Sequence, residues 1–365
     1  MSQSKLKILV IPRRPGMVSQ FLRESLAPRM RLSGVEVSVT AELPDRSVLS
    51  QFDSIIADVF SMDEILRIRT CNPQSKIGFA DPKVLTTRDE HLLKATDFAL
   101  VASRELESRV IQCGVMPVMV FWVPELDHLK IAPAKTPGRG LYHGNKVHLQ
   151  SMASTTLSAL VSLNMTLSEA EKIKLECHYN IEKLGRWNIS AAAGRDVTHV
   201  QFSQPATWIS LASSSFGIVP NLLPTRNVLG ETNNYPRVTK ILRRSGANPL
   251  LLRHDDIALR YKVTTNAARI YPFAYFGVPV LADLSASVSE FLQHMKSGLL
   301  CWNQQSWKQA LAFARGNPLA MEEYGTNLKR EVVPIMGPEA SAQRVLSLLR
   351  RLGAAQPFLQ DGSAI

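Results

Sequence analysis

Three polar side chains, Lys262, Asn266 and Arg269, are spaced four and three residues apart within the segment KVTTNAARIYPFAYFGVPVLAD. In a helix this spacing places them on one face near the helix start, where backbone N–H groups and the macrodipole favour an anion. Two cations and an amide at such a position are suited to binding phosphate. The spacing alone fits equally well with an ordinary amphipathic helix whose charges are solvated.

The rest of the chain indicates the fold in which this segment lies. Apolar runs of four to six residues alternate with helix-like stretches, which is typical of parallel strands covered by helices on both faces. One such series runs from residue 7 to residue 124. A second begins at LYHGN, residues 141–145, after a stretch rich in Pro, Lys and Gly. We therefore predict an α/β protein with two Rossmann-like lobes and a cleft between them.

The same patterns set the expected domain boundaries. The segment PEASAQRVLSLLRRL near the C-terminus has an acidic first turn and a basic last turn, as a helix prefers. The predicted parts are an N-terminal lobe (1–125), a linker (126–140), a C-terminal lobe (141–337), a C-terminal helix (338–352) and a poorly ordered tail (353–365).

Polar residues follow two predicted strands of the second lobe. In doubly wound sheets, ligands bind beyond the carboxyl ends of the strands. The turn after LYH contains His143, Gly144 and Lys146, where the glycine allows close backbone approach and the lysine supplies a point charge. After VPVLAD, Ser285 and Ser287 are placed to cap the next helix and to present its free N–H donors to an anion. Each of these segments also fits an ordinary turn or helix cap.

Composition narrows the classes of partner. The chain has 42 Lys and Arg against 31 Asp and Glu, a formal net charge of +11, so its field attracts anions. The basic residues are dispersed and aromatic residues make up only 7%, which argues against nucleic acid. The four cysteines form no CxxC pair, so no metal site is expected. No apolar run reaches about 18 residues and no signal peptide is recognisable, so we expect a cytoplasmic protein.

Six motifs follow one another in the second half of the chain: LYHGNK, SFGIVPN, K-x-x-x-N-x-x-R, FGVPVLAD, MKSGLLCW and SWKQAL. Their order resembles the nucleotide-binding lobe of GT-B nucleotide-sugar glycosyltransferases, in particular the family 4-like or group 1-like enzymes. In the first lobe, TDFALVASRELESRVIQCGV is similar to the unit that closes the acceptor lobe of that fold. The resemblance covers roughly residues 95–320. Where many members have a Glu-x7-Glu pair that contacts the donor, this chain has Thr264 and Pro272.

The resemblance implies a hexosyltransferase-like enzyme that moves a sugar from a nucleoside diphosphate to an acceptor hydroxyl, in cell-surface polysaccharide or glycolipid synthesis. Lys146, Lys262, Arg269 and the turn at Ser285 would then stabilise the departing diphosphate without a required cofactor. Asn266 would orient phosphate or ribose. The missing Glu pair leaves the donor sugar and the stereochemical outcome open.

Polar residues also follow three strands of the first lobe. Arg13, Arg14 and Gly16 come directly after the first strand, where they are placed to meet an anionic acceptor such as a lipid-linked phosphate or to remain solvated. An inverting reaction needs a general base, and Asp58 and Asp81 at strand ends are the candidates. An Asp at such a position is more often a turn former or helix cap.

A second class of function is compatible with the same sequence. Because the Glu pair is missing, the chain also fits a catalytically silent GT-B-like subunit that binds nucleotide or stabilises a partner. Release of sugar from a nucleotide sugar would distinguish the two. The expected partners are a nucleotide sugar and a lipid-linked or glycan hydroxyl acceptor, with peripheral contact to an anionic membrane left open.

Overall fold

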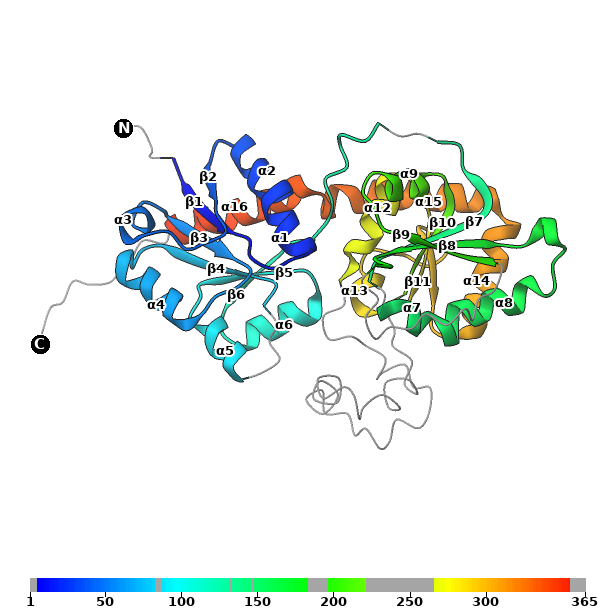
Figure 1. The fold of residues 1–365 in the computed structure, drawn as a ribbon, viewed down its shortest axis with the longest axis horizontal. Coiled ribbons are helices and arrows are strands. Elements are labelled where there is room, and N and C mark those ends of the chain that lie inside the picture. Colours follow the sequence, from blue (N-terminus) through cyan, green and yellow to red (C-terminus); the bar gives the residue numbers. More distant parts are fainter. Residues whose placement is uncertain are drawn as a thin grey trace, which may run out of the picture. The chain divides into compact units, whose positions relative to one another are not determined.

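The computed structural model describes residues 5–82, 87–130, 133–145, 147–182, 196–220 and 266–354. The chain divides into two compact units (Figure 1). Unit 1 consists of Met1–Glu125 and Ile335–Ile365, and unit 2 consists of Leu126–Pro334. The C-terminal helix therefore belongs to the same unit as the first strand.

Unit 1 is built on a parallel sheet of six strands in the order β2-β1-β3-β4-β5-β6. Residues of β3 and β5 are buried throughout, because helices cover both faces of the sheet as the apolar runs predicted (Figure 1). The strands are β1 (Lys7–Ile11), β2 (Glu36–Val39), β3 (Ser54–Ala57), β4 (Lys76–Ala80), β5 (Phe98–Val101) and β6 (Met116–Met119).

Side-chain caps mark the start of the helices α4 and α6 of unit 1. Ser61 and Glu64 form a capping box at the start of α4, and the Ser103 hydroxyl accepts the Leu106 N–H at the start of α6. The C-terminal helix α16 packs against α2, η1 and β6. The helices are α1 (Met17–Phe21), the π-helix η1 (Leu22–Leu26), α2 (Ala27–Leu32), α3 (Arg46–Leu49), α4 (Met62–Cys71), α5 (Thr87–Lys94), α6 (Arg104–Gln112) and α16 (Pro338–Ala354).

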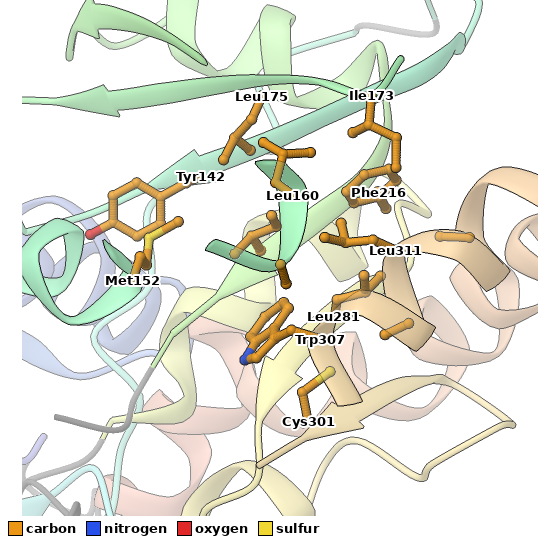
Figure 2. Close-up of a cluster of buried hydrophobic side chains, with 14 of the residues drawn as sticks. Tyr142, Met152, Leu160, Ile173, Leu175, Phe216, Leu281, Cys301, Trp307 and Leu311 are labelled. Carbon is orange, nitrogen blue, oxygen red and sulfur yellow. The ribbon is translucent and has the colours of Figure 1, made fainter. Parts of the chain in front are cut away.

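Unit 2 repeats this plan with a second parallel sheet, in the order β12-β11-β10-β7-β8-β9. One face of the sheet is covered by an apolar cluster to which α8 and α14 contribute (Figure 2). Trp307 of α14 is fully buried in this cluster. The strands are β7 (Thr136–His143), β8 (Lys174–Tyr179), β9 (Val197–Gln201), β10 (Ser214–Val219), β11 (Val280–Asp283) and β12 (Gly298–Cys301).

The described helical segments of unit 2 are α7 (Val147–Met152), the π-helix η2 (Ala153–Leu157), α8 (Ser158–Asn164), the 3-10 helix η3 (Glu169–Glu171), α9 (Ala206–Ala212), the 3-10 helix η8 (Ala267–Arg269), α12 (Ile270–Tyr275), α13 (Ala286–Ser289), α14 (Gln304–Gly316) and α15 (Pro318–Met336), whose last two residues belong to unit 1. The Lys residue at position 262 lies outside the described residues. The expectation of one helical face through Asn266 and Arg269 was wrong, because the helix begins only at Ala267. Asn266 is instead the N-cap, and its Oδ1 accepts the Ala268 N–H at 2.8 Å.

Both sheets contain the same kind of packing contact, in which a glycine is paired with a phenylalanine on the neighbouring strand. Gly78 of β4 pairs with Phe98 of β5, and Gly140 of β7 pairs with Phe216 of β10. A Cβ atom at Gly78 would lie 2.3 Å from the Phe98 ring, and one at Gly140 would lie 2.5 Å from the Phe216 ring. Each phenylalanine therefore covers the backbone of a glycine.

We expect Gly78→Ala and Gly140→Ala each to lower the free energy of unfolding by about 1–3 kcal/mol, because the added methyl group overpacks the interior. Gly316→Ala is the control, since nothing lies within 4 Å of its Cβ position. That variant should match or slightly exceed the wild-type stability. Equal denaturation midpoints in urea for all three variants would contradict this account of the packing.

Candidate functional site

The order of the strands in the unit 2 sheet reverses between β7 and β10. From β7 the strand order runs through β8 to β9 at one edge, and from β10 it runs through β11 to β12 at the other. Ligands of doubly wound proteins bind beyond the carboxyl ends of the strands at such a switch point. In this chain that position is occupied by the turn after β7, which contains Gly144.

The turn after β7 is tightly fixed. Gly144 has φ of 145°, a conformation that favours glycine, and its N–H donates to the His178 carbonyl at 3.1 Å. The Tyr142 hydroxyl donates to the Asn145 carbonyl at 2.7 Å. A Cβ atom at Gly144 would lie 3.1 Å from the Tyr142 hydroxyl and 3.3 Å from Cδ of Arg269. The structure therefore brings Gly144 and Arg269 together, two residues that the sequence analysis assigned to one phosphate site.

Arg269 is a half-buried cation, and the Nη1 atom of its guanidinium is shielded from solvent. Burial lowers the pKa of its guanidinium, while the Tyr142 hydroxyl and the Asp283 carboxylate favour the charged form. Asp283 is itself 2% exposed, and its Oδ1 accepts the indole N–H of Trp307 at 2.9 Å. A positive charge is thus held beside the Gly144 turn, at the end of the sheet where a ligand is expected.

His143 lies on the other side of β7 from Tyr142 and is not a surface group. Its ring packs against Trp208 and Phe273, with ring centroids 5.3 and 5.2 Å away. Its Nε2 lies 3.3 Å from the Arg269 carbonyl oxygen, so the neutral ring donates there. Burial, followed by the charge of Arg269, lowers the pKa of His143 to about 3. His143 therefore fixes the position of the Arg269 backbone.

Ser285 and Ser287 lie where β11 meets the short helix α13, and both are buried. The Ser285 hydroxyl makes no cap bond to α13, and within the described part of the chain it has no hydrogen-bond partner. Leaving a buried hydroxyl unsatisfied costs about 1–3 kcal/mol, which a bound ligand would recover. Pro272, at the position of the second family glutamate, is buried in the first turn of α12 and offers no donor or acceptor side chain.

In unit 1 the strand order reverses between β1 and β3, and the loop after β1 contains Arg13 and Arg14. Asp58, which follows β3, is fully buried. Its carboxylate accepts the Arg13 N–H at 2.8 Å, the Arg14 N–H at 3.0 Å and the Ser19 hydroxyl. This geometry fits a group that fixes the loop better than a base exposed to an acceptor.

The two arginine side chains of the loop differ in the ion pairs and hydrogen bonds that they make. The Arg13 guanidinium pairs with Glu64 at 2.7 Å and donates to the Ala41 carbonyl at 3.1 Å. Arg14 donates to the Asp81 carbonyl at 3.4 Å. Asp81 has φ of 51°, a left-handed conformation that is uncommon for a residue with a side chain. Gly16, with φ of 120°, precedes α1.

Two residues of the unit 2 site, Tyr142 and Trp307, were missed from the sequence, and Asp283 was placed in a ligand-facing loop without a role. Tyr142 and Asp283 stand at the ends of predicted strands, which was an available signal, but Trp307 comes from a helix distant in sequence. Of the residues predicted for the phosphate site, Lys146 and Lys262 lie outside the described residues. Across the described ranges, no group of His, Cys, Asp or Glu is arranged to hold a metal ion, and no helix is long and apolar enough to cross a membrane.

No protein-family model matches this sequence, and no curated protein matches it either. Solved structures do match over nearly the whole chain. Anabaena HepE in complex with UDP-glucose has a TM-score of 0.60 and 10% identity, with 95% of this chain and 100% of that chain covered. The chain has the GT-B fold. The avilamycin A glycosyltransferase AviGT4 (TM-score 0.60, 12% identity, 96% and 99% covered) and a glycosyltransferase of Rickettsia africae (0.60, 8%, 97% and 100%) share it.

These matches confirm the predicted fold class of two Rossmann-like lobes with a C-terminal helix. In this GT-B chain, the turn after β7 and the segment from Asn266 to Arg269 meet at the switch point of the second sheet. The local arrangement is a cation, the buried hydroxyl of Tyr142 and a glycine turn. Chemically, such a set is able to bind an anion with several oxygens.

Replacing Asp58 by Asn should lower the free energy of unfolding by about 1.5–3 kcal/mol, since one amide cannot accept all three donors. Asp45→Asn is the control, because its side chain is 97% exposed, and it should change stability by less than about 0.5 kcal/mol. Urea denaturation measures both. If Asp58→Asn left stability unchanged and abolished activity, a role as catalytic base would be indicated instead.

The folded protein should keep His143 neutral between pH 8 and pH 5, as the lowered pKa of about 3 requires. The unfolded chain takes up this proton below its ordinary pKa of 6.5. The burial of His143 therefore disfavours the folded state increasingly as the pH falls from about 6.5 toward 3. Imidazole ¹⁵N NMR, assigned with a His143→Gln variant, checks this, and a titration midpoint near 6.5 would contradict the packing described.

Proposed function

We propose that this chain is a glycosyltransferase that takes a sugar from a nucleoside-diphosphate sugar and transfers it to an acceptor hydroxyl. The observation that carries the proposal is the half-buried Arg269 guanidinium beside the Gly144 turn, at the switch point of the second sheet. The GT-B fold supports it by analogy, since HepE with this fold was solved with UDP-glucose. UDP-sugars are therefore the first donors to test.

In this proposal Arg269 holds the diphosphate and stabilises the charge that develops on it as the glycosidic bond breaks. Ser285 donates its buried hydroxyl to the same phosphates. Lys146 and Lys262 add further positive charge. Asn266, whose Oδ1 already accepts the Ala268 N–H, orients phosphate or ribose with the remaining part of its amide. Cationic side chains supply the charge, so no cofactor is included in the proposed reaction.

The acceptor is proposed to enter near the loop of Arg13 to Gly16. The Arg14 guanidinium makes a single long hydrogen bond, whereas that of Arg13 makes an ion pair and a hydrogen bond. Arg14 is therefore the better candidate to bind an anionic acceptor. If the reaction inverts the anomeric centre, Asp81 is the proposed base, because Asp58 is engaged by three donors. We extend the proposal to a lipid-linked or glycan acceptor at an anionic membrane surface, since the net charge is +11.

Binding of a nucleoside diphosphate tests the proposal. UDP, GDP or ADP at 100 times its dissociation constant should stabilise the protein by about 2.7 kcal/mol in thermal unfolding. Arg269→Met, which removes the charge at similar volume, should weaken binding about 10- to 100-fold. Arg315→Met is the control. Arg315 of α14 pairs with Glu171 of η3 at 3.0 Å, and this variant should leave binding unchanged.

A transfer assay separates the enzyme from a silent binding subunit. The purified protein is incubated with radiolabelled UDP-sugars and an acceptor screen that includes glycans and anionic lipid vesicles. We expect release of nucleoside diphosphate with label on one acceptor. Binding of a diphosphate with neither hydrolysis nor transfer from any donor would favour the silent subunit, and absence of binding would sink both alternatives.

A further inference from the structure

Tyr142 places its ring in an apolar cluster and its hydroxyl beside polar groups. Its side chain is fully buried within the cluster that covers one face of the second sheet, beside Met152 (Figure 2). Burial raises the pKa of the hydroxyl above its ordinary value, so it keeps its proton. A buried hydroxyl needs hydrogen-bond partners, because leaving it without them costs free energy. What it contacts therefore indicates why a tyrosine rather than a phenylalanine stands here.

One partner of the Tyr142 hydroxyl is the turn after β7. The hydroxyl donates to the Asn145 carbonyl at 2.7 Å, and the same carbonyl accepts the His148 N–H at 3.0 Å in the first turn of α7. The hydroxyl thus connects the end of β7 to the start of the helix that follows. The segment it fixes is the one that contains Gly144.

The other partner is Arg269. The Arg269 guanidinium lies near the Tyr142 hydroxyl, and this proximity favours the charged form of the arginine. The Cβ position of Gly144 lies 3.1 Å from the hydroxyl and 3.3 Å from Cδ of Arg269, so all three groups are neighbours. A hydroxyl has one donor hydrogen and two acceptor lone pairs, which is enough to serve both partners together.

We infer that Tyr142 is a positioning residue for the diphosphate site, because its hydroxyl holds the Arg269 guanidinium and the Gly144 turn in one arrangement before the donor binds. This inference rests on the proposed function. The hydroxyl acts through Arg269 and touches no reacting atom. Its contribution is preorganisation, since a flexible arginine side chain would lose rotamer freedom on binding.

The test is Tyr142→Phe in the full-length protein, with UDP, GDP and ADP binding measured by isothermal titration calorimetry. The ring is kept, so the cluster stays filled and only the hydroxyl's hydrogen bond to Asn145 and its interaction with Arg269 are lost. The dissociation constant for the tightest-binding diphosphate should rise about tenfold. Tyr179→Phe is the matched control, since its hydroxyl contacts His199 Nδ1 at 3.1 Å on the same sheet, and it should bind within about twofold of wild type.

A double-mutant cycle shows whether Tyr142 acts through Arg269. In an Arg269→Met background, Tyr142→Phe should cause no further loss of affinity, because the group that it positions is gone. Independent, additive losses would overturn the inference. So would a Tyr142→Phe variant that is less stable but binds the diphosphate as wild type does. If wild type itself binds no diphosphate, the proposed function fails first, and the two failures are thereby told apart.

Discussion

The central constraint in the second unit is the charge of Arg269, which is partly removed from solvent. Taking a guanidinium out of water is costly unless polar groups and opposite charge lie beside it. Tyr142 and Asp283 favour its charged form, Trp307 holds Asp283 in place, and His143 holds the Arg269 backbone. Four segments distant in sequence are therefore organised around one cation. Because the cation lies at a switch point of the sheet, where ligands of such folds bind, we interpret the arrangement as one that binds an anionic ligand and does not only stabilise the fold.

The fold could be predicted largely from local patterns. Parallel strands covered on both faces need uninterrupted apolar runs, and those runs mark β1, β3, β5 and β10 directly. Pairings across long distances were not accessible in this way. The position of α16 in unit 1 depends on its contacts with α2 and β6, and the pairs Gly78–Phe98 and Gly140–Phe216 depend on strand register. Neither strand neighbours nor register can be read from the period of the pattern.

The site was predicted less completely, for a physical reason. Side-chain type indicates which chemistry is possible, but burial and partners decide which role is filled. Asn266 was expected on a helix face and instead caps the helix, because its side chain satisfies an N–H at the first turn. Asp58 was a candidate base by position, yet its carboxylate is engaged by the loop of Arg13 and Arg14. Turn and strand-end positions thus identified the neighbourhood, while hydrogen bonds distinguish the groups within it.

The GT-B fold is shared with solved glycosyltransferases at identities of 8–12%, a level at which the backbone persists while binding residues diverge. The most direct test of the central claim is amide hydrogen exchange with and without the nucleoside diphosphate that binds most tightly. The account predicts slower exchange at residues 144–149, 267–271 and 284–288, with the sheet of unit 1 unaffected. Protection confined to unit 1, or absent from both the Gly144 turn and the Arg269 segment, would contradict it.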